Sequence, residues 1–450
     1  MGSRETLMAE GVVFLLAPLA LALFGLPAAW ATPVDRFSAA GRFSAAFVMG
    51  VVVFTVWLTL LSTVGIRWSA ASVVAPLAIG SIAGAIVLSR RVALAGNDGG
   101  ETGTVAWLAG GLALAAGSGH LVLMALTSRA TSIDLLYFWG VKAQRFAELG
   151  AIDATLLADP LAVHMHSNYP PLLPIVYAWG IGLAGRLPWQ MALASCAVWL
   201  VAGVPLLRDL LGRVMHRDEA TMASSFWFLA MALAVPASLS AGNAEPAMVL
   251  FSSVAVAALL ERSARWLAVV ALAGIVLTKN EGLVVFALIA GAAVARDILE
   301  GTRGARLARR AAAVVLVPLA ALGAWLLFEA LHGVPMEDVT REKAGVMALG
   351  RAGEVAAGMM KNLDAGSAGI AWLVAALLIA KSWRRWRALL PAIAPALGTL
   401  AFLFVYYLHF RGDGLDVWMR WTMPRVSLGA LAAALVGAAF AGAREPDAET

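Results

Sequence analysis

The sequence of 450 residues has few charged side chains and a single cysteine. Charged residues make up 14% of it and hydrophobic residues 61%, against roughly 25% and 45–50% in an average soluble domain. This composition excludes a soluble enzyme, a disordered chain and a nucleic-acid-binding protein, and it is typical of a chain that folds in lipid. Cys196 stands alone in an apolar run, so the chain has neither a disulfide framework nor a cysteine zinc site.

The chain also lacks the local motifs of common nucleotide-binding and hydrolytic sites. It contains no Walker motif, no glycine-rich dinucleotide fingerprint after a strand and no nucleophile elbow. A P-loop transport ATPase and a dinucleotide-dependent enzyme are therefore unsupported. The net charge of +5 comes from arginines that lie mostly in short segments between apolar runs, which indicates membrane topology and not nucleic-acid binding.

The apolar runs predict an all-α integral membrane protein with about thirteen transmembrane helices and juxtamembrane helices on the outer face. A crossing helix needs about 20 mostly apolar residues, and shorter runs can cross when they are tilted or packed. Four of the predicted spans are short for a full crossing: 247–261, 266–278, 282–296 and 368–381. The other predicted spans are 9–31, 45–65, 71–89, 104–126, 189–206, 222–240, 311–329, 388–408 and 424–441.

The basic loops predict the orientation, because lysine and arginine collect on the cytoplasmic side. The segments expected there are 90–91, 208–217, 296–310 and 381–387. The run 170–184 opens with a Pro-Pro pair and is short, so we interpret it as a helix that dips into the outer face without crossing. The N-terminus is then outside and the C-terminus inside. The outer segments are 127–188, 242–246, 279–281, 330–367 and 409–423.

The outer segment 127–188 carries the strongest candidate site. Asp134 lies a few residues beyond a predicted span, and residues 134–148 form an amphipathic pattern that Gly150 can cap. Lys142 and Arg145 lie within about 80° of Asp134 around this helix. A helix of this kind lies in the membrane interface and would hold a carboxylate and two cations at head-group depth. Alternatively, Asp134 caps the helix and the two cations reach toward the interface as anchors.

A second polar patch follows with His164, His166, Asn168 and Tyr169. A His-x-His pair can bind metal, but no third ligand is evident, so a structural role of the two histidines is the favoured interpretation.

Four further residues combine charge with a helix end. Glu245 lies in a tight outer turn, where a carboxylate is costly unless it is solvated, paired or functional. Lys279 either pairs with Glu281 in a hairpin or reaches a phosphate. Arg420 and Arg425 lie at the mouth of the final span, where arginine suits phosphate recognition and also serves as an ordinary membrane anchor.

The order of these features resembles the GT-C superfamily of membrane glycosyltransferases, which includes bacterial aminoarabinose and galacturonosyl transferases and protein O-mannosyltransferases. The resemblance covers about 104–300 and rests on four stretches of the sequence: 133–143, 168–174, 242–246 and 278–282. The chain departs from the family where Asp134 stands alone in place of paired acids, and where Tyr169 replaces a common lysine before the Pro pair.

This resemblance implies sugar transfer, with inversion, from a polyprenyl-phosphate donor to a glycan, lipid or protein acceptor at the outer face of a cell inner membrane. Asp134 would be the catalytic base and Glu245 a second site acid. Arg145, His166 and Tyr169 would bind substrate, and the candidates for the donor phosphate are Lys142, Lys279, Arg420 and Arg425. The resemblance leaves room for a divalent cation and involves no nucleic acid.

The predicted organisation has three parts: additional helices at 1–103, a catalytic core at 104–300 and C-terminal helices at 301–450. The alternative function is a transporter or flippase of lipid-linked or anionic substrates. A transporter should hold its charged side chains near the bilayer midplane, whereas the charges here collect in outer loops and at helix ends.

Overall fold

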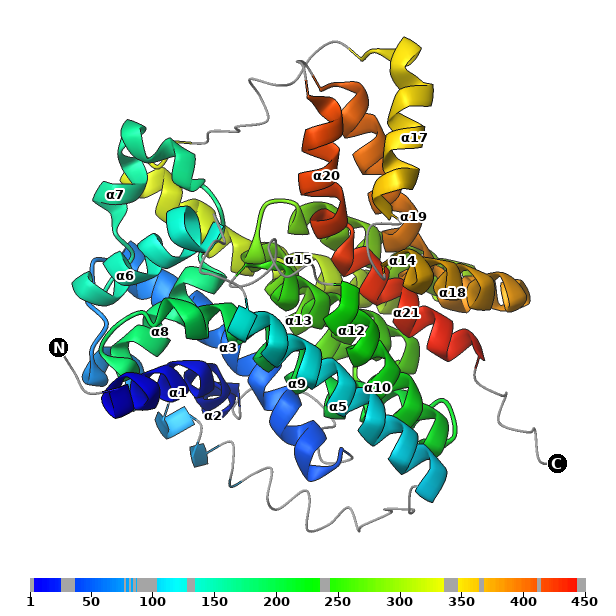
Figure 1. The fold of residues 1–450 in the computed structure, drawn as a ribbon, viewed down its shortest axis with the longest axis horizontal. Helices are drawn as coiled ribbons and strands as arrows, with labels where there is room; N and C mark the ends of the chain where they lie inside the picture. Colours follow the sequence, from blue (N-terminus) through cyan, green and yellow to red (C-terminus); the bar gives the residue numbers. More distant parts are fainter. Residues whose placement is uncertain are drawn as a thin grey trace.

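The structure is a computed structural model, and it is all-helical in the parts of the chain that it describes (Figure 1). The described residues are 4–25, 37–76, 78–80, 82–83, 86, 103–127, 134–234, 243–335, 347–363, 368–410 and 414–442. The predicted fold class is thus confirmed at the level of an all-α protein.

Most predicted spans coincide with a helix, because each apolar run ends where polar or turn-forming residues begin. The helices of the first half are α1 (Arg4–Ala20), α2 (Ala22–Gly25), α3 (Ala39–Thr63), η3 (Ala70–Val74), α5 (Thr104–Thr127), η4 (Leu135–Trp139), α6 (Gly140–Leu149), α7 (Ala154–Ala158), η5 (Pro160–Met165), α8 (Leu172–Ala184), α9 (Trp189–Leu211) and α10 (Arg217–Ala234).

The helices of the second half are α12 (Glu245–Glu261), α13 (Arg265–Thr278), α14 (Gly282–Leu299), α15 (Gly304–His332), η6 (Leu349–Arg351), α17 (Ala352–Leu363), α18 (Ala368–Lys381), η7 (Trp383–Arg385), α19 (Trp386–Leu408), α20 (Leu415–Val426) and α21 (Leu428–Gly442).

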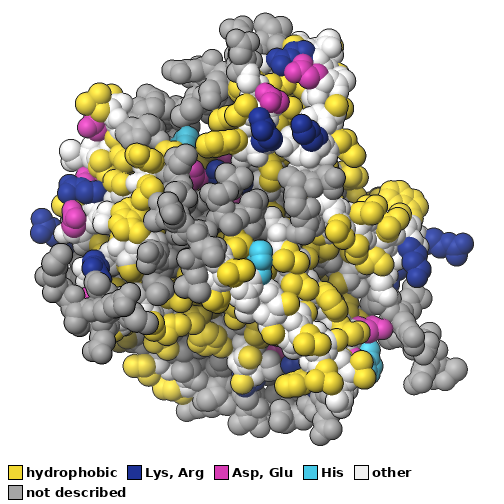
Figure 2. Space-filling view, viewed as in Figure 1, with side chains coloured by type: hydrophobic (Ala, Val, Ile, Leu, Met, Phe, Trp, Pro, Cys, Tyr) yellow, Lys and Arg dark blue, Asp and Glu magenta, His cyan; other side chains and the backbone are white. Residues whose placement is uncertain are grey.

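Several helices are long and apolar enough to cross a membrane. Five meet that test among the described residues, and up to seven do so if each of two bent helix pairs forms one span. The chain is therefore a candidate membrane protein, whereas about thirteen crossings stay a prediction. Hydrophobic side chains cover much of the face seen in Figure 2, over α18 and along α5. Exposed apolar side chains on helices of this length suit contact with lipid.

Close contact between α2 and α3 shows how the small residues of this chain are used. A Cβ atom at Gly50 would lie 1.8 Å from the carbonyl oxygen of Leu21, and one at Gly25 would lie 1.8 Å from that of Ala46. Two glycines therefore let the two backbones touch where any side chain would separate them.

The helix α12 is buried from Glu245 to Leu260 and forms the centre of the helical body.

Charged side chains collect at two opposite ends of the central helices. At one end, Glu245 at the start of α12 meets Lys279, which follows α13. At the other end, α12 finishes at Glu261, whose carboxylate accepts a hydrogen bond from Arg213 at 3.0 Å. The 17 residues of α12 separate the two ends by roughly 24 Å at 1.5 Å per residue.

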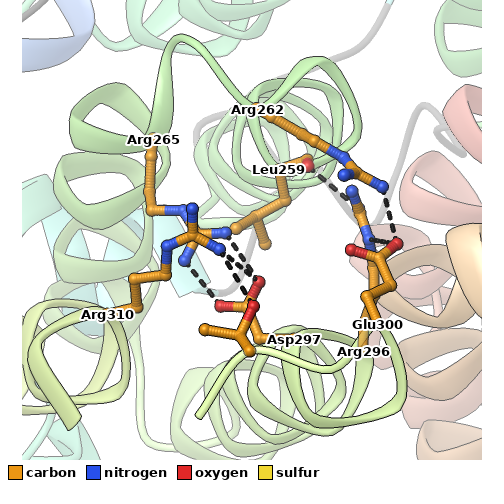
Figure 3. Close-up of polar contacts among 8 residues, drawn as sticks. Leu259, Arg262, Arg265, Arg296, Asp297, Glu300 and Arg310 are labelled. Atoms are coloured by element: carbon orange, nitrogen blue, oxygen red, sulfur yellow. Dashed lines mark hydrogen bonds and ion pairs between the residues drawn. The ribbon is translucent and has the colours of Figure 1, made fainter. Parts of the chain in front are cut away.

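The Glu261 end is held by a network of arginines and carboxylates (Figure 3). Asp297 of α14 accepts two hydrogen bonds from Arg265, at 2.7 and 3.1 Å, and one from Arg310 at 3.1 Å. Beside it, Glu300 binds both Arg262 and Arg296. The predicted basic segments 208–217 and 296–310 therefore share one end of the molecule. The segment 90–91 lies outside the described residues.

Both flanks of the short helix α8 contact elements near the Glu245 end, while its dip into the outer face without crossing stays a prediction. Just before it, the Tyr169 hydroxyl donates to Glu281, which directly precedes α14. Just after it, Trp189 opens α9 and packs against Gly140, next to the Leu135–Trp139 turn. Both flanks of the 13-residue α8 thus lie on the same side of the helical body.

Two segments predicted as loops are partly helical. Within 330–367, α17 carries one apolar side, and within 409–423 the chain forms α20, which continues to Val426. These two helices and the end of α19 project from the rest of the body (Figure 1). They pack through a small core of their own that includes Val355, Met359, Tyr407 and Met419. The helix α20 meets α21 at a bend of 44°.

Candidate functional site

Arg425 joins two acidic residues that are far apart in the sequence. Its Nε donates to Glu245 Oε1 at 3.0 Å, and its Nη2 donates to Asp134 Oδ2. The guanidinium is 19% exposed, whereas the side chains of Glu245 and Asp134 are 1% and 16% exposed. The α20 helix, predicted as part of a loop, therefore carries a cation into a half-buried site between the two carboxylates that the sequence singled out.

Lys279 adds a second cation at the same carboxylate. Its Nζ donates to Glu245 Oε1 at 3.0 Å, and the lysine side chain is 7% exposed. Burial disfavours the charged ammonium, but Glu245 and Glu281 outweigh this effect and raise the pKa of Lys279 above its usual value. Lys279 is thus held as a cation, and its closest ion pair is with Glu245 and not with Glu281.

The local backbone explains why both carboxylates point into the site. Glu245 is the first residue of α12 and is followed by Pro246, which suits the first turn of a helix. Asp134 precedes a widened turn at Leu135–Trp139 and makes no capping hydrogen bond. The interpretation of Asp134 as a helix cap is therefore wrong, and its carboxylate is directed to Arg425 instead.

The predicted amphipathic helix after Asp134 is present as η4 followed by α6. Gly150 ends it in the left-handed region, with φ of 61°, as expected for a helix C-cap.

Tyr169 places a phenol beside this cluster. Its hydroxyl donates to Glu281 Oε1 at 3.3 Å, and its ring lies 4.7 Å from the His166 ring in a stacked arrangement. Burial and the neighbouring Glu281 carboxylate raise the pKa of Tyr169 well above its usual value, so the phenol stays protonated and acts as a hydrogen-bond donor.

The cluster carries one more formal negative charge than positive charge when all groups are ionised. It holds three carboxylates, of Asp134, Glu245 and Glu281, around the cations of Lys279 and Arg425. Burial raises the pKa of Asp134, Arg425 opposes that shift, and Glu245 adds to it. Asp134 is thereby a stronger proton acceptor than an exposed aspartate. Among the described residues, Glu245 Oε2 and Glu281 Oε2 are buried without a hydrogen-bond partner.

Lys142 and His166 form a neighbouring layer. The Lys142 side chain is buried, and its Nζ donates to the backbone carbonyl of His166 at 2.5 Å. The His166 ring also meets the Phe138 ring edge-on at 4.7 Å. Desolvation lowers the pKa of Lys142 to about 7, and Glu329 on α15 partly offsets this effect.

Two predicted site residues lie outside the cluster. Arg145 is on an exposed side of α6, where it binds Glu148 and Asp153 at 3.0 Å each. Arg420 is 57% exposed and pairs with Asp416 along α20. Arg420 and Arg425 are five positions apart on α20, which places them about 140° apart around the helix. Arg425 therefore reaches Asp134 and Glu245, whereas Arg420 points to another side.

The sequence interpretation missed two acidic residues next to the site. The sequence pattern indicates Glu281 only as a partner of Lys279, and it does not single out Glu329. A lone carboxylate within an apolar run, as at Glu329, is a signal that sequence reasoning can use, because such a residue is costly in a membrane unless it is paired or functional.

The described residues contain no group of three or more histidine, cysteine or acidic side chains arranged to hold a metal ion. The expectation of a divalent cation therefore finds no ligand set in this part of the chain. The His164 side chain lies outside the described residues.

No family model, curated protein or solved structure matches this chain. The functional argument therefore depends on the chemistry of the site. A buried arginine and lysine can bind a phosphate, an aspartate with a raised pKa can accept a proton, and unpartnered carboxylate oxygens can accept hydrogen bonds from hydroxyl groups.

Proposed function

We propose that the protein is a polytopic membrane glycosyltransferase with a GT-C-like arrangement. It transfers a sugar from a polyprenyl-phosphate donor to a glycan, lipid or protein acceptor at the outer face of the cell inner membrane. In this proposal the chain crosses the membrane about thirteen times. The basic end around Asp297 faces the cytoplasm, and the end that carries Asp134 and Glu245 faces outward.

The observation that carries this proposal is the contact of Arg425 with both Asp134 and Glu245, beside the buried Lys279. The four residues come from four separate parts of the sequence and combine a proton acceptor with two phosphate-binding cations. Arginine offers five N–H donors, and only two are used by these carboxylates. Donors therefore remain for the oxygens of a phosphate group.

In the proposed reaction, the acceptor hydroxyl oxygen attacks the anomeric carbon of the sugar. The bond between that carbon and the phosphate oxygen breaks, and the configuration at the carbon inverts. The acceptor proton passes to the carboxylate of Asp134, whose raised pKa suits this role. The electron pair leaves with the polyprenyl phosphate, whose negative charge Arg425 and Lys279 bind.

The remaining groups of the cluster have supporting roles in this scheme. Glu245 fixes both cations through one oxygen, and its other oxygen is buried without a hydrogen-bond partner. Tyr169 is held by Glu281 at the edge of the cluster, where an aromatic ring can pack against the apolar face of a sugar.

A transfer assay tests this proposal. Purified protein is incubated with a panel of polyprenyl-phosphate sugars and lipid, glycan and peptide acceptors. We expect Asp134→Asn to reduce turnover by roughly 10²-fold or more, because a general base contributes about 10²–10⁴-fold. Arg420→Met, which removes an exposed cation of the same helix as Arg425, should retain turnover within about twofold.

Two results would contradict the proposal. One is an Asp134→Asn protein that transfers sugar at the wild-type rate. The other is a folded wild-type protein that consumes no donor of the panel.

A further inference from the structure

The turn 166–169 connects the buried Lys142 to the candidate catalytic cluster. The carbonyl oxygen of His166 accepts two hydrogen bonds, one from Lys142 Nζ at 2.5 Å and one from the Tyr169 backbone N–H at 3.0 Å. His166 has φ of 51°, in the left-handed region that residues other than glycine rarely adopt. Such a backbone conformation persists only where its surroundings hold it in place.

A second helix holds the same turn from another direction. Trp325 of α15 donates through its ring nitrogen to the carbonyl of Asn168 at 3.4 Å. One turn further along α15, Glu329 is 5% exposed, and its Oε1 is buried without a hydrogen-bond partner. Glu329 favours the charged form of Lys142, although these two described side chains form no ion pair. The other groups that face the ammonium are the His166 carbonyl and the Trp139 ring, whose centroid is 5.7 Å away.

We infer that Lys142 is a positioning residue, not a phosphate ligand, and that together with Trp325 it braces the turn 166–169 so that Tyr169 is held against Glu281 at the edge of the catalytic cluster. The effect of Lys142 on turnover rests on the proposed function. The brace itself is a property of the fold, so it can be measured without any substrate.

Burial opposes the charge of Lys142 and lowers its pKa to about 7. The closed turn therefore holds a neutral amine above that pH, whereas an opened turn would return the side chain to water as an ammonium. Opening that exposes Lys142 is thus expected to become harder as the pH rises above about 7.

Hydrogen exchange measures the brace directly, in the full chain reconstituted in lipid nanodiscs. At pH 8, Lys142→Met should speed exchange in the peptide covering 164–170 by about fivefold, as expected for loss of a buried hydrogen bond. The control Glu148→Gln removes an exposed charge of the same helix and should change exchange by less than about twofold. Wild-type exchange, corrected for intrinsic rates, should be faster at pH 6 than at pH 8, and this difference should be absent in Lys142→Met. An unchanged rate in Lys142→Met at pH 8 would overturn the brace.

Turnover separates positioning from phosphate binding. We expect Lys142→Met to lower kcat with the KM for the lipid-phosphate donor changed less than about twofold. Lys142→Arg keeps a hydrogen-bond donor at this position and should retain more turnover than Lys142→Met. A raised KM with unchanged kcat would show direct phosphate contact and overturn the inference. If the wild-type protein transfers no sugar, the proposed function fails, while hydrogen exchange still decides the brace.

Discussion

The ion pair of Glu245 and Lys279 gives a sharp test of the site's architecture. Replacing Glu245 by glutamine leaves Lys279 buried at 7% exposure with its closest carboxylate removed. An unpaired buried charge of this kind costs about 3–5 kcal/mol of folding free energy. Arg425 is affected less in this variant, because it keeps its contact with Asp134.

The reverse substitution is predicted to be milder. Lys279→Met leaves Glu245 Oε1 with its hydrogen bond from Arg425 at 3.0 Å, so no isolated buried charge results. We expect a cost of about 1–3 kcal/mol, the usual range for loss of one partner of a buried polar group. In the double variant of Glu245→Gln and Lys279→Met, no unpaired ammonium remains. Its loss of folding free energy should therefore be about 2 kcal/mol smaller than the sum of the losses in the two single variants.

Denaturant unfolding of the wild type, the two single variants and the double variant in one detergent gives the free energies that this comparison needs. The matched control is the exposed pair Arg351 and Glu354, which lies on the protein surface with side chains 33% and 58% exposed. The variants Arg351→Met and Glu354→Gln should show a coupling well below that of Glu245 and Lys279, because water screens an exposed ion pair. A coupling for Glu245 and Lys279 no larger than this control, or a Lys279→Met variant less stable than Glu245→Gln, would refute the reasoning.

Three further substitutions test other parts of the account. Asp297→Asn removes a buried carboxylate that binds two arginines, so thermal unfolding should show a loss of about 2–4 kcal/mol while the folded fraction keeps its activity; unaltered stability would contradict the network. Gly50→Ala places a Cβ against the Leu21 carbonyl and should lower the free energy of unfolding by about 1–3 kcal/mol in the same assay. Unchanged stability would contradict the contact between α2 and α3. Arg425→Met should lower transfer by roughly 10²-fold, and equal activity of Arg425→Met and Arg420→Met would contradict the selective role of Arg425.

The positions of the long helices could be predicted because hydrophobicity alone determines them. For example, the predicted runs 189–206, 266–278 and 388–408 correspond to the helices Trp189–Leu211, Arg265–Thr278 and Trp386–Leu408. Differences at the ends arise where charged side chains such as Arg208 extend a helix beyond its apolar part. Polar helix ends carry no hydropathy signal, so their last turns could not be predicted.

The helices α17 and α20 could not be predicted from hydropathy. They are 12 residues long, and their apolar side chains pack mainly against each other and α19. Pro424 and the charged residues of α20 favour a loop when the sequence is considered alone. Tertiary packing of Met419 and Met423 into the small core stabilises the helix instead.

The site residues could be predicted better than their contacts. Charges at helix ends singled out Asp134, Glu245, Lys279 and Arg425, and the structure brings all four together. The pairing itself depends on the packing of α12, α13 and α20, which a single sequence does not specify. For the same reason, the burial of Lys142 under the His166 carbonyl could not be predicted.

The most direct test of the central claim follows the fate of the donor in proteoliposomes. A polyprenyl-phosphate sugar is labelled on both the sugar and the phosphate, and the products are separated after incubation with wild-type protein and a suitable acceptor. The account predicts that sugar appears on the acceptor with inverted configuration, with one polyprenyl phosphate released for each sugar transferred, and that Asp134→Asn abolishes both products. Movement of the intact donor across the bilayer without cleavage would contradict the account and would indicate a transporter.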